Sequence, residues 1–298
     1  MNFYKKIIRN KKVRFQILNA LKFIPDKPML YLQYFIKHQR ILNLKNPKRF
    51  TEKIQWYKLY YRNEQMVVCS DKYKVRDFVK ERGLDYILNE LYAVYKRPED
   101  ICLDALPNTF VLKANKGSGT NILCKDKNRI SKEDIVKEFE EFRKQTETSA
   151  GREWGYSNIE PCIIAEKYLE DPSSEDLSLK DYKFICFNGE PKYIVCDVNR
   201  FTNHERNIYD LQWNNLHVKT DCGTHKHNIE CPDNLDEMLD VARTLSEDFP
   251  FVRVDLYSIQ GKIYFGEMTF YPWSGYVKFT PDSFDFELGI KFVLPEGS

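Results

Sequence analysis

The chain has 298 residues, of which 42% are hydrophobic and 14% aromatic. This length and composition are typical of one large or two ordinary globular domains, and they exclude a disordered or fibrous chain. The net charge is +2, yet residues 1–62 contain sixteen Lys or Arg and two acidic residues, against thirty basic and forty-two acidic residues in 63–298. The basic part indicates either a solvated helical face or contact with an anionic acceptor or an anionic membrane surface.

The eight cysteines form no C-x-x-C pair, and several lie inside apolar runs such as YKFICF and YIVCDV. Buried thiols in a reducing compartment account for this pattern better than disulfides, and better than zinc held by Cys222, His225, His227 and Cys231. No apolar run reaches the ~20 residues that span a bilayer. The cationic start lacks the unbroken apolar core of a signal peptide. We therefore expect a cytoplasmic protein.

The first part of the chain predicts helices. Apolar residues recur at helical spacing over 11–24 and again over about 29–43. The segment NPKRFTEKIQWYKLYY predicts a helix with Thr51 as its N-cap. The segment SDKYKVRDFVKERGLDY predicts another helix, which Ser70 or Asp71 caps and Gly83 closes.

From about residue 109 the pattern changes to strands. TFVLKAN and NILCKD predict two strands, a charged helix follows near 131–146, and CIIAEKYLED predicts a third strand. DYKFICFNGEPKYIVCDVNR predicts a hairpin that turns at Asn188-Gly189. A helix is expected at about 234–247, and FVRVDLYSIQGKIYFGEMTF predicts a second hairpin around Gly261. The fold class is therefore α+β, with mostly antiparallel sheets after a helical start.

Two acidic residues of the last hairpin are candidates for a metal site. If the loop holds an odd number of residues, such as Gln260-Gly261-Lys262, Asp255 faces Glu267 across the ladder. Directly opposed residues have Cβ atoms about 4.5–5.5 Å apart, and a pair of carboxylates suits Mg²⁺ with nucleotide phosphates. A two-residue loop would put them on opposite faces, and two solvated acids remain the alternative.

Two further segments suggest a nucleotide. In FVLKANKGSGTN a predicted strand is followed by lysines and glycines, both of which suit an anion. The order of these residues is not that of a P-loop, and a surface hairpin remains the alternative. IIAEKYLED is an apolar strand that leads into polar residues. Backbone donors and acceptors beside hydrophobic walls suit a flat adenine ring.

In this order the segments resemble the ATP-grasp enzymes, and more narrowly the TupA-like (teichuronopeptide biosynthesis) ATP-grasp family. The resemblance covers about 46–295 and includes NPKRFTEKIQWYKLYY, FVLKANKGSGTNI, DYKFICFNGEPKYI, FVRVDLYSIQGKIYFGEMTFYPWSG and LGIKFVLP. It implies two antiparallel-sheet α+β subdomains that clamp ATP, in a domain spanning 63–298. The lid subdomain would cover about 100–165 and the C-terminal subdomain about 166–298. A basic helical region, 1–62, precedes them in place of the usual α/β domain.

The resemblance also implies roles for individual residues. Those that would bind ATP are Lys72, Lys113, Lys116, Gly117, Ser118, Gly119, Glu166, Lys167, Tyr168 and Leu169. Asp255, Glu267 and Thr269 would hold Mg²⁺, with Thr269 standing where many members have asparagine. Arg253 would clamp a phosphate or an intermediate. Lys183 and Arg200 are further candidates for phosphate or substrate contacts, unless they pair with Asp181 or Asp197 instead.

The implied activity is that of an ATP-dependent carboxylate–amine ligase in cell-surface polysaccharide biosynthesis. Its substrates would be an amino acid and a uronic-acid-containing glycan or precursor, joined as an amide through an acyl phosphate, and nucleic acid is not expected. Two alternatives stay open: a kinase of the same fold that acts on a sugar or lipid carrier, and a non-catalytic protein that binds polyanions.

Overall fold

A computed structural model describes residues 17–18, 20–117, 121–146, 151–174, 177–200 and 202–295. Half of the helix expected over 11–24 lies outside these residues, as do Ser118 and Gly119. The chain divides into two compact units. Unit 1 comprises Met1–Met29, Asn63–Phe78 and Asn89–Leu169, and unit 2 comprises Leu30–Arg62, Val79–Leu88 and Glu170–Ser298.

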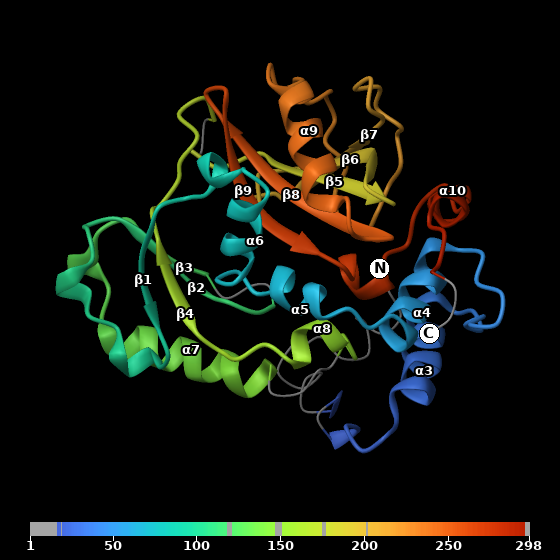
Figure 1. Ribbon diagram of the computed structural model, residues 1–298, viewed down its shortest axis with the longest axis horizontal. Helices are drawn as coiled ribbons and strands as arrows, with labels where there is room; N and C mark the ends of the chain where they lie inside the picture. The colour runs from blue at the N-terminus through green and yellow to red at the C-terminus, as the bar shows by residue number, and fades with distance from the viewer. Residues whose placement is uncertain are drawn as a thin grey trace. The chain divides into compact units, whose positions relative to one another are not determined.

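Unit 1 is built on a four-stranded antiparallel sheet in the order β1-β4-β2-β3 (Figure 1). The strands are β1 (Leu91–Tyr95), β2 (Phe110–Ala114), β3 (Asn121–Cys124) and β4 (Ile163–Glu166). Helix α7 (Lys132–Thr146) covers one face, where Ile135 and Phe139 pack against Phe110 and Leu112. Because side chains alternate along a strand, Lys113 and Glu166 lie on the opposite face.

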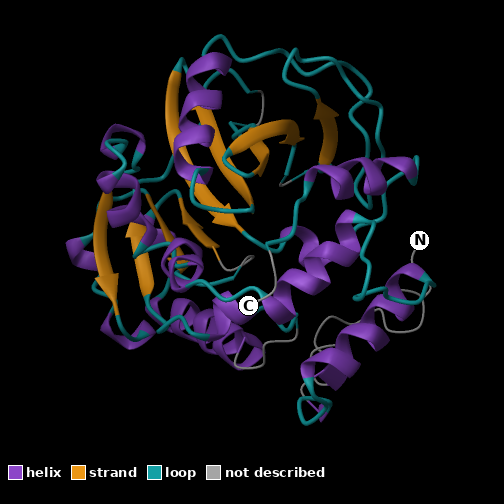
Figure 2. Ribbon diagram, turned by 45° about the vertical axis from the view of Figure 1, so that its right-hand side comes forward, coloured by secondary structure: helices purple, strands orange, loops and turns teal. Residues whose placement is uncertain are grey.

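Unit 2 is built on a five-stranded antiparallel sheet in the order β7-β6-β5-β8-β9. The strands are β5 (Asp181–Phe187), β6 (Glu190–Val198), β7 (Glu205–Tyr209), β8 (Phe251–Ile259) and β9 (Lys262–Thr269). Helix α9 (Leu235–Ser246) packs against β5, β6 and β8 with its apolar side, including Val241 and Leu245 (Figure 2). The polar side chains of these strands therefore gather on the other face.

The remaining helices among the described residues complete the two units. They are α3 (Asp26–His38), α4 (Phe50–Tyr60), α5 (Glu64–Ser70), α6 (Val75–Glu81), α8 (Trp154–Ser157) and α10 (Ser283–Lys291), with 3₁₀ turns at Asp85–Ile87, Pro98–Asp100, Leu103–Ala105, Lys127–Arg129 and Pro272–Gly275. In the parts of the chain that the structure describes, every helix is too short or too polar to cross a bilayer.

Helix α4 belongs to the core of unit 2. Its Phe50 ring lies 5.1 Å from the ring of Phe251 in β8, and its Tyr57 ring lies 5.3 Å from that of Phe292. The N-cap of α4 is Arg49, so the expected cap at Thr51 is wrong. The buried carboxylate of Asp285 accepts hydrogen bonds from both Thr51 N (2.9 Å) and Thr51 Oγ1 (2.8 Å), and a contact so distant in sequence leaves no local signal.

Basic residues between 30 and 62 serve contacts inside unit 2. Lys58 is only 1% exposed, and its Nζ donates to Ser274 O and Oγ. Lys53 Nζ donates to Phe292 O, and Arg49 binds Asp282 with two nitrogens. Some of the basic residues of this segment therefore stabilise the fold of unit 2.

The predicted hairpin at Asn188-Gly189 is confirmed, with positive φ at both residues (48° and 78°) as a type I′ turn requires. The strands and helices expected after residue 109 are present within a few residues of their predicted bounds. The single helix expected from Ser70 or Asp71 is instead α6 alone, and Lys72 lies in the turn before it. All eight cysteines are free thiols. The described residues hold no metal-binding cluster of three or more His, Cys, Asp or Glu, and His225 contacts Glu205 rather than a cysteine.

Candidate functional site

The predicted lysines of unit 1 lie at the end of β2. Lys72 is fixed there twice, because its backbone N donates to Asn115 O (2.8 Å) and its Nζ donates to Gly117 O (2.6 Å). Lys113 Nζ lies 2.8 Å from Glu166 Oε2 on the face of the sheet that α7 leaves uncovered. Lys72 is thus linked to Gly117 and Lys113 to Glu166 near the end of β2. Phosphate binding by the two lysines remains a prediction.

Glu166 also binds a cation that the sequence did not single out. Arg76 Nη1 lies 3.0 Å from Glu166 Oε1, and its Nη2 donates to Asn89 O at 2.6 Å. Both oxygens of this nearly buried carboxylate are therefore neutralised, one by Arg76 and one by Lys113. Arg76 follows Lys72 by four residues, and that spacing alone did not distinguish it from a surface arginine.

The segment expected to read adenine continues from β4. The backbone of Lys167 is engaged on both sides, since its N donates to Glu90 O (2.9 Å) and its O accepts from Asn89 Nδ2 (2.8 Å). Its carbonyl can still accept a second hydrogen bond, whereas its N–H cannot readily donate another. The Tyr168 ring lies 5.5 Å from Lys125 Nζ. The roles of Glu166, Lys167, Tyr168 and Leu169 remain predictions.

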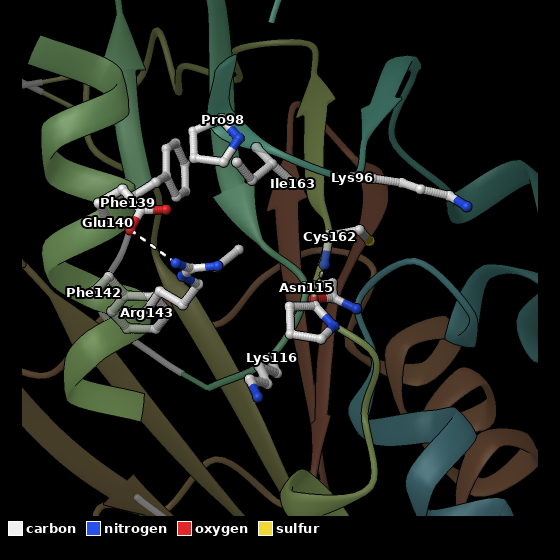
Figure 3. A pocket seen from close by; sticks show the side chains of 12 residues that line it. Lys96, Pro98, Asn115, Lys116, Phe139, Glu140, Phe142, Arg143, Cys162 and Ile163 are labelled. Atoms are coloured by element: carbon white, nitrogen blue, oxygen red, sulfur yellow. Dashed lines mark hydrogen bonds and ion pairs between the residues drawn. The ribbon is translucent and has the colours of Figure 1, made fainter. Parts of the chain in front are cut away.

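A small hollow of about 60 Å³ opens on the other face of this sheet (Figure 3). Phe139 and Phe142 of α7 line it together with Ala114 and Ile163, and Lys116 lies at its rim. Ala114 and Ile163 belong to the α7 side of the sheet. The structure therefore places Lys116 away from Lys113, and its phosphate contact remains a prediction.

The predicted residues of unit 2 share the sheet face opposite α9. Pairing places Lys183 beside Asp255, Asp255 opposite Glu267, and Arg253 opposite Thr269. The same face continues along the sheet with further charged residues, namely Asp181 in β5, Asp197 in β6 and Arg206 in β7. All of these side chains except that of Glu267 are largely buried. Buried charges of both signs must be paired, and here they form one network.

A β-bulge brings the two predicted metal-binding carboxylates together. The hairpin loop has only two residues, Gln260 and Gly261, which is the alternative that was expected to put the two carboxylates on opposite faces. The register shifts between Asp255 and Leu256, which leaves Gly266 as the extra residue of β9 and restores the Asp255–Glu267 pair. A Cβ at position 266 would lie 2.9 Å from Asp255 O, so glycine is required there.

One nitrogen of Arg253 contacts all three predicted metal ligands. Its Nη2 lies 2.6 Å from Asp255 Oδ2, 3.4 Å from Glu267 Oε1 and 3.1 Å from Thr269 Oγ1. The three oxygens therefore converge on a positive charge in this structure. Two carboxylates and a hydroxyl that converge on one cation form an oxygen donor set that fits Mg²⁺.

Lys183 and Arg200 both bind the acids of this network. Lys183 Nζ contacts Asp181 Oδ2 and lies 3.0 Å from Asp255 Oδ2, while Arg200 Nη1 lies 2.6 Å from Asp181 Oδ2. The pairing with Asp181 that was the alternative for both residues is thus present. A substrate contact by either remains a prediction, since each still has donors left over.

Burial and charge pairing act against each other in this network. Burial raises the pKa of Asp255, and the charges of Arg253 and Lys183 reduce that rise. For Asp197 burial is again the largest influence, but the hydrogen bonds and charge of Arg206 outweigh it and hold the pKa well below its usual range. Burial lowers and Asp255 raises the pKa of Arg253, which ends above its usual value. Arg253 is therefore permanently charged.

A family model described as TupA-like ATPgrasp matches residues 52–293. Solved structures similar to this chain include D-alanine–D-alanine ligase from Bacillus anthracis (16% identity over 68% of this chain and 57% of that chain, TM-score 0.40). The same enzyme from Helicobacter pylori matches at 15% identity over 82% and 68% (TM-score 0.44). Phosphoribosylamine–glycine ligase from Thermotoga maritima matches at 14% identity over 69% and 48% (TM-score 0.38).

This chain spans 57% of the length of the Bacillus anthracis ligase. A search of curated proteins finds no match. The family model covers most of the chain, and it covers every predicted site residue from Lys72 to Thr269. The chain therefore belongs to the TupA-like ATP-grasp family.

Proposed function

We propose that this protein is an ATP-dependent carboxylate–amine ligase that joins an amino acid to the carboxylate of a uronic acid. The observation that carries the proposal is the convergence of Asp255, Glu267 and Thr269 on a single cationic nitrogen, within a chain of the ATP-grasp family. An oxygen set of this kind is suited to holding a nucleotide-bound Mg²⁺.

The resemblance to the family assigns residues to each part of the nucleotide. In unit 1, Lys72 and Lys113 carry the positive charge that phosphates need, and the segment from Glu166 to Leu169 offers backbone groups to the base. In unit 2, Asp255, Glu267 and Thr269 would hold Mg²⁺, which would neutralise charge on the phosphates when bound. Phosphoryl transfer depends mainly on such positioning and neutralisation.

The reaction has two steps in which atoms balance. A carboxylate oxygen of the uronic acid attacks the γ-phosphorus, ADP departs, and an acyl phosphate remains. The amine of the amino acid then attacks the acyl carbon, inorganic phosphate departs with that carboxylate oxygen, and the amine nitrogen loses a proton. Arg253 is permanently charged and would stabilise the negative charge that develops in the first step.

The uronic acid and amino acid are the finer part of the proposal, and they follow from the resemblance of the whole chain to its family. A place in cell-surface polysaccharide synthesis and contact with an anionic acceptor or membrane belong to the same proposal. The basic residues of 30–62 support anion contact only in part, because several are engaged within unit 2.

The test is a screen of uronic acids against amino acids with ATP and Mg²⁺, which follows ADP, phosphate and product mass. A ligase releases ADP and phosphate only when acid and amine are both present, and an ¹⁸O-labelled carboxylate transfers one ¹⁸O to the phosphate. A phosphorylated sugar without an amine requirement would identify the kinase alternative. Polyanion binding without ADP formation across the screen would leave the non-catalytic alternative.

A further inference from the structure

Trp273 has no part in the roles described above, yet it contacts two arginines of the charged sheet face in unit 2. The Cζ of Arg206 lies 5.2 Å and the Cζ of Arg253 lies 5.8 Å from the centroid of its ring. Both distances are within the ~6 Å typical of cation–π contacts. The two guanidinium carbons therefore lie within 11 Å of each other, and the partly buried indole contacts both.

The backbone that carries Trp273 is held in an unfavourable conformation. Trp273, Ser274 and Gly275 are consecutive residues with positive φ (51°, 55° and 66°). Such a conformation is unfavourable for a residue other than glycine, and it persists only where the surroundings impose it. Here Lys58 Nζ donates to Ser274 O (2.9 Å), and Gln55 Nε2 donates to Ser274 O and Gly275 O (3.1 Å each).

Arg206, like Arg253, is held by the two oxygens of one aspartate. Its Nε and Nη2 donate to the two oxygens of Asp197 at 2.6 and 3.0 Å, as Arg253 donates with the same atoms to Asp255. Its remaining nitrogen, Nη1, has weaker partners among the described residues. Thr220 Oγ1 lies 3.4 Å from it, and Asp221 Oδ1, on an exposed side chain, lies 3.9 Å from it. This nitrogen can therefore donate to an incoming anion.

We propose that Arg206 and Trp273 form the subsite for the acid substrate of the ligase, in which Arg206 Nη1 binds an organic carboxylate and the indole packs against the ring that bears it. The inference rests on the proposed function. ATP and Mg²⁺ need the lysines of unit 1 and the oxygens around Arg253, so the Arg206–Asp197 pair and the indole are left for another substrate. A guanidinium beside an apolar plane matches a molecule with one acidic group on a compact ring.

The experiment measures binding of D-glucuronate and of its neutral counterpart D-glucose to the full chain saturated with Mg²⁺ and a non-hydrolysable ATP analogue. The variants are Arg206→Gln, Trp273→Ala and Trp273→Phe. Arg243→Gln, on the exposed side of α9, and Trp154→Phe, in unit 1, serve as matched controls. Binding of the Mg²⁺–nucleotide complex is measured for every variant.

We expect the wild type to bind D-glucuronate at least tenfold more tightly than D-glucose. Arg206→Gln should abolish that preference and leave nucleotide affinity within twofold. Trp273→Ala should weaken D-glucuronate at least tenfold, and Trp273→Phe should restore most of the loss. If Trp273→Ala does not fold, the binding measurements on Arg206→Gln and Trp273→Phe test the subsite.

Two results would overturn the subsite: a wild type that binds nucleotide but does not prefer D-glucuronate, or an Arg206→Gln variant that keeps the preference. A wild type that binds no Mg²⁺–nucleotide complex would instead refute the proposed function, and the subsite would fall with it.

Discussion

Replacement of Gly266 by alanine tests whether the β-bulge creates the predicted metal site. The new Cβ would lie 2.9 Å from Asp255 O, 3.3 Å from Asp255 C and 3.3 Å from Tyr257 Cε2. Two of these atoms belong to the backbone of β8 and cannot rotate away. Overpacking of this kind costs about 1–3 kcal/mol, which corresponds to a fall in Tm of roughly 2–12 °C.

The same change should weaken metal-dependent nucleotide binding, because β9 must shift and Glu267 then moves relative to Asp255. Loss of one contact to a charged group costs about 1.5–3 kcal/mol, or roughly tenfold to a hundredfold in affinity. Differential scanning fluorimetry gives the Tm, and isothermal titration calorimetry with Mg²⁺ and an ATP analogue gives the affinity.

The control is Gly261→Ala at the tip of the same hairpin, where no atom lies within 4 Å but φ is +76°. This variant should lose about 1–2 kcal/mol of stability through backbone strain and keep its nucleotide affinity. A Gly266→Ala variant that binds the Mg²⁺–nucleotide complex as tightly as the wild type would refute the reasoning.

Three further results are expected. Arg76→Met should lower the free energy of unfolding by about 3 kcal/mol in urea titrations, because it leaves the buried Glu166 with Lys113 alone. The surface control Arg243→Met should lose less than about 0.5 kcal/mol, and an equally small loss in Arg76→Met would contradict the prediction. Burial lowers the pKa of His38 to about 4, so the folded state binds fewer protons than the unfolded state, whose His pKa is about 6.5. The contribution of neutral His38 to the free energy of unfolding is then complete above pH 6.5 and falls by about 3 kcal/mol as the pH drops toward 4. Unfolding titrations at pH 7.5 and 4.5 would reveal this loss, and His38→Gln should remove it. Burial raises the pKa of the Cys186 thiol to about 12. At pH 8 a thiol reagent should therefore modify the exposed Cys102 and Cys231 at once and reach Cys186 only after denaturation. Rapid modification of Cys186 in the folded protein would count against its burial.

Local patterns in the sequence were sufficient for the hairpins and for the order of the main elements. Both predicted hairpins are present, one turning at Asn188-Gly189 and the other around Gly261. These features depend on neighbours in the chain, so a single sequence contains them. Recognition of the ATP-grasp fold rested on the order of several weak motifs, and the family match confirms it.

Features that depend on distant contacts were missed or wrong. The bulge at Gly266 lets a two-residue loop keep Asp255 opposite Glu267, and no local pattern distinguishes that glycine from others. Thr51, in the first turn of α4, binds Asp285, which is more than two hundred residues away. Arg206 lies in an edge strand, β7, that the sequence did not predict, and its pairing with Asp197 is visible only in the assembled sheet.

The proposal depends most on two roles, namely that Lys113 binds ATP and that Glu267 holds its Mg²⁺. Calorimetric titration of the wild type with a non-hydrolysable ATP analogue, with and without Mg²⁺, tests it most directly. We predict saturable binding that requires Mg²⁺ and weakens at least tenfold in both Lys113→Ala and Glu267→Gln, while the exposed α7 controls Lys132→Ala and Glu133→Gln bind as the wild type does. Binding that is indifferent to Mg²⁺, or unchanged in both site variants, would contradict the account.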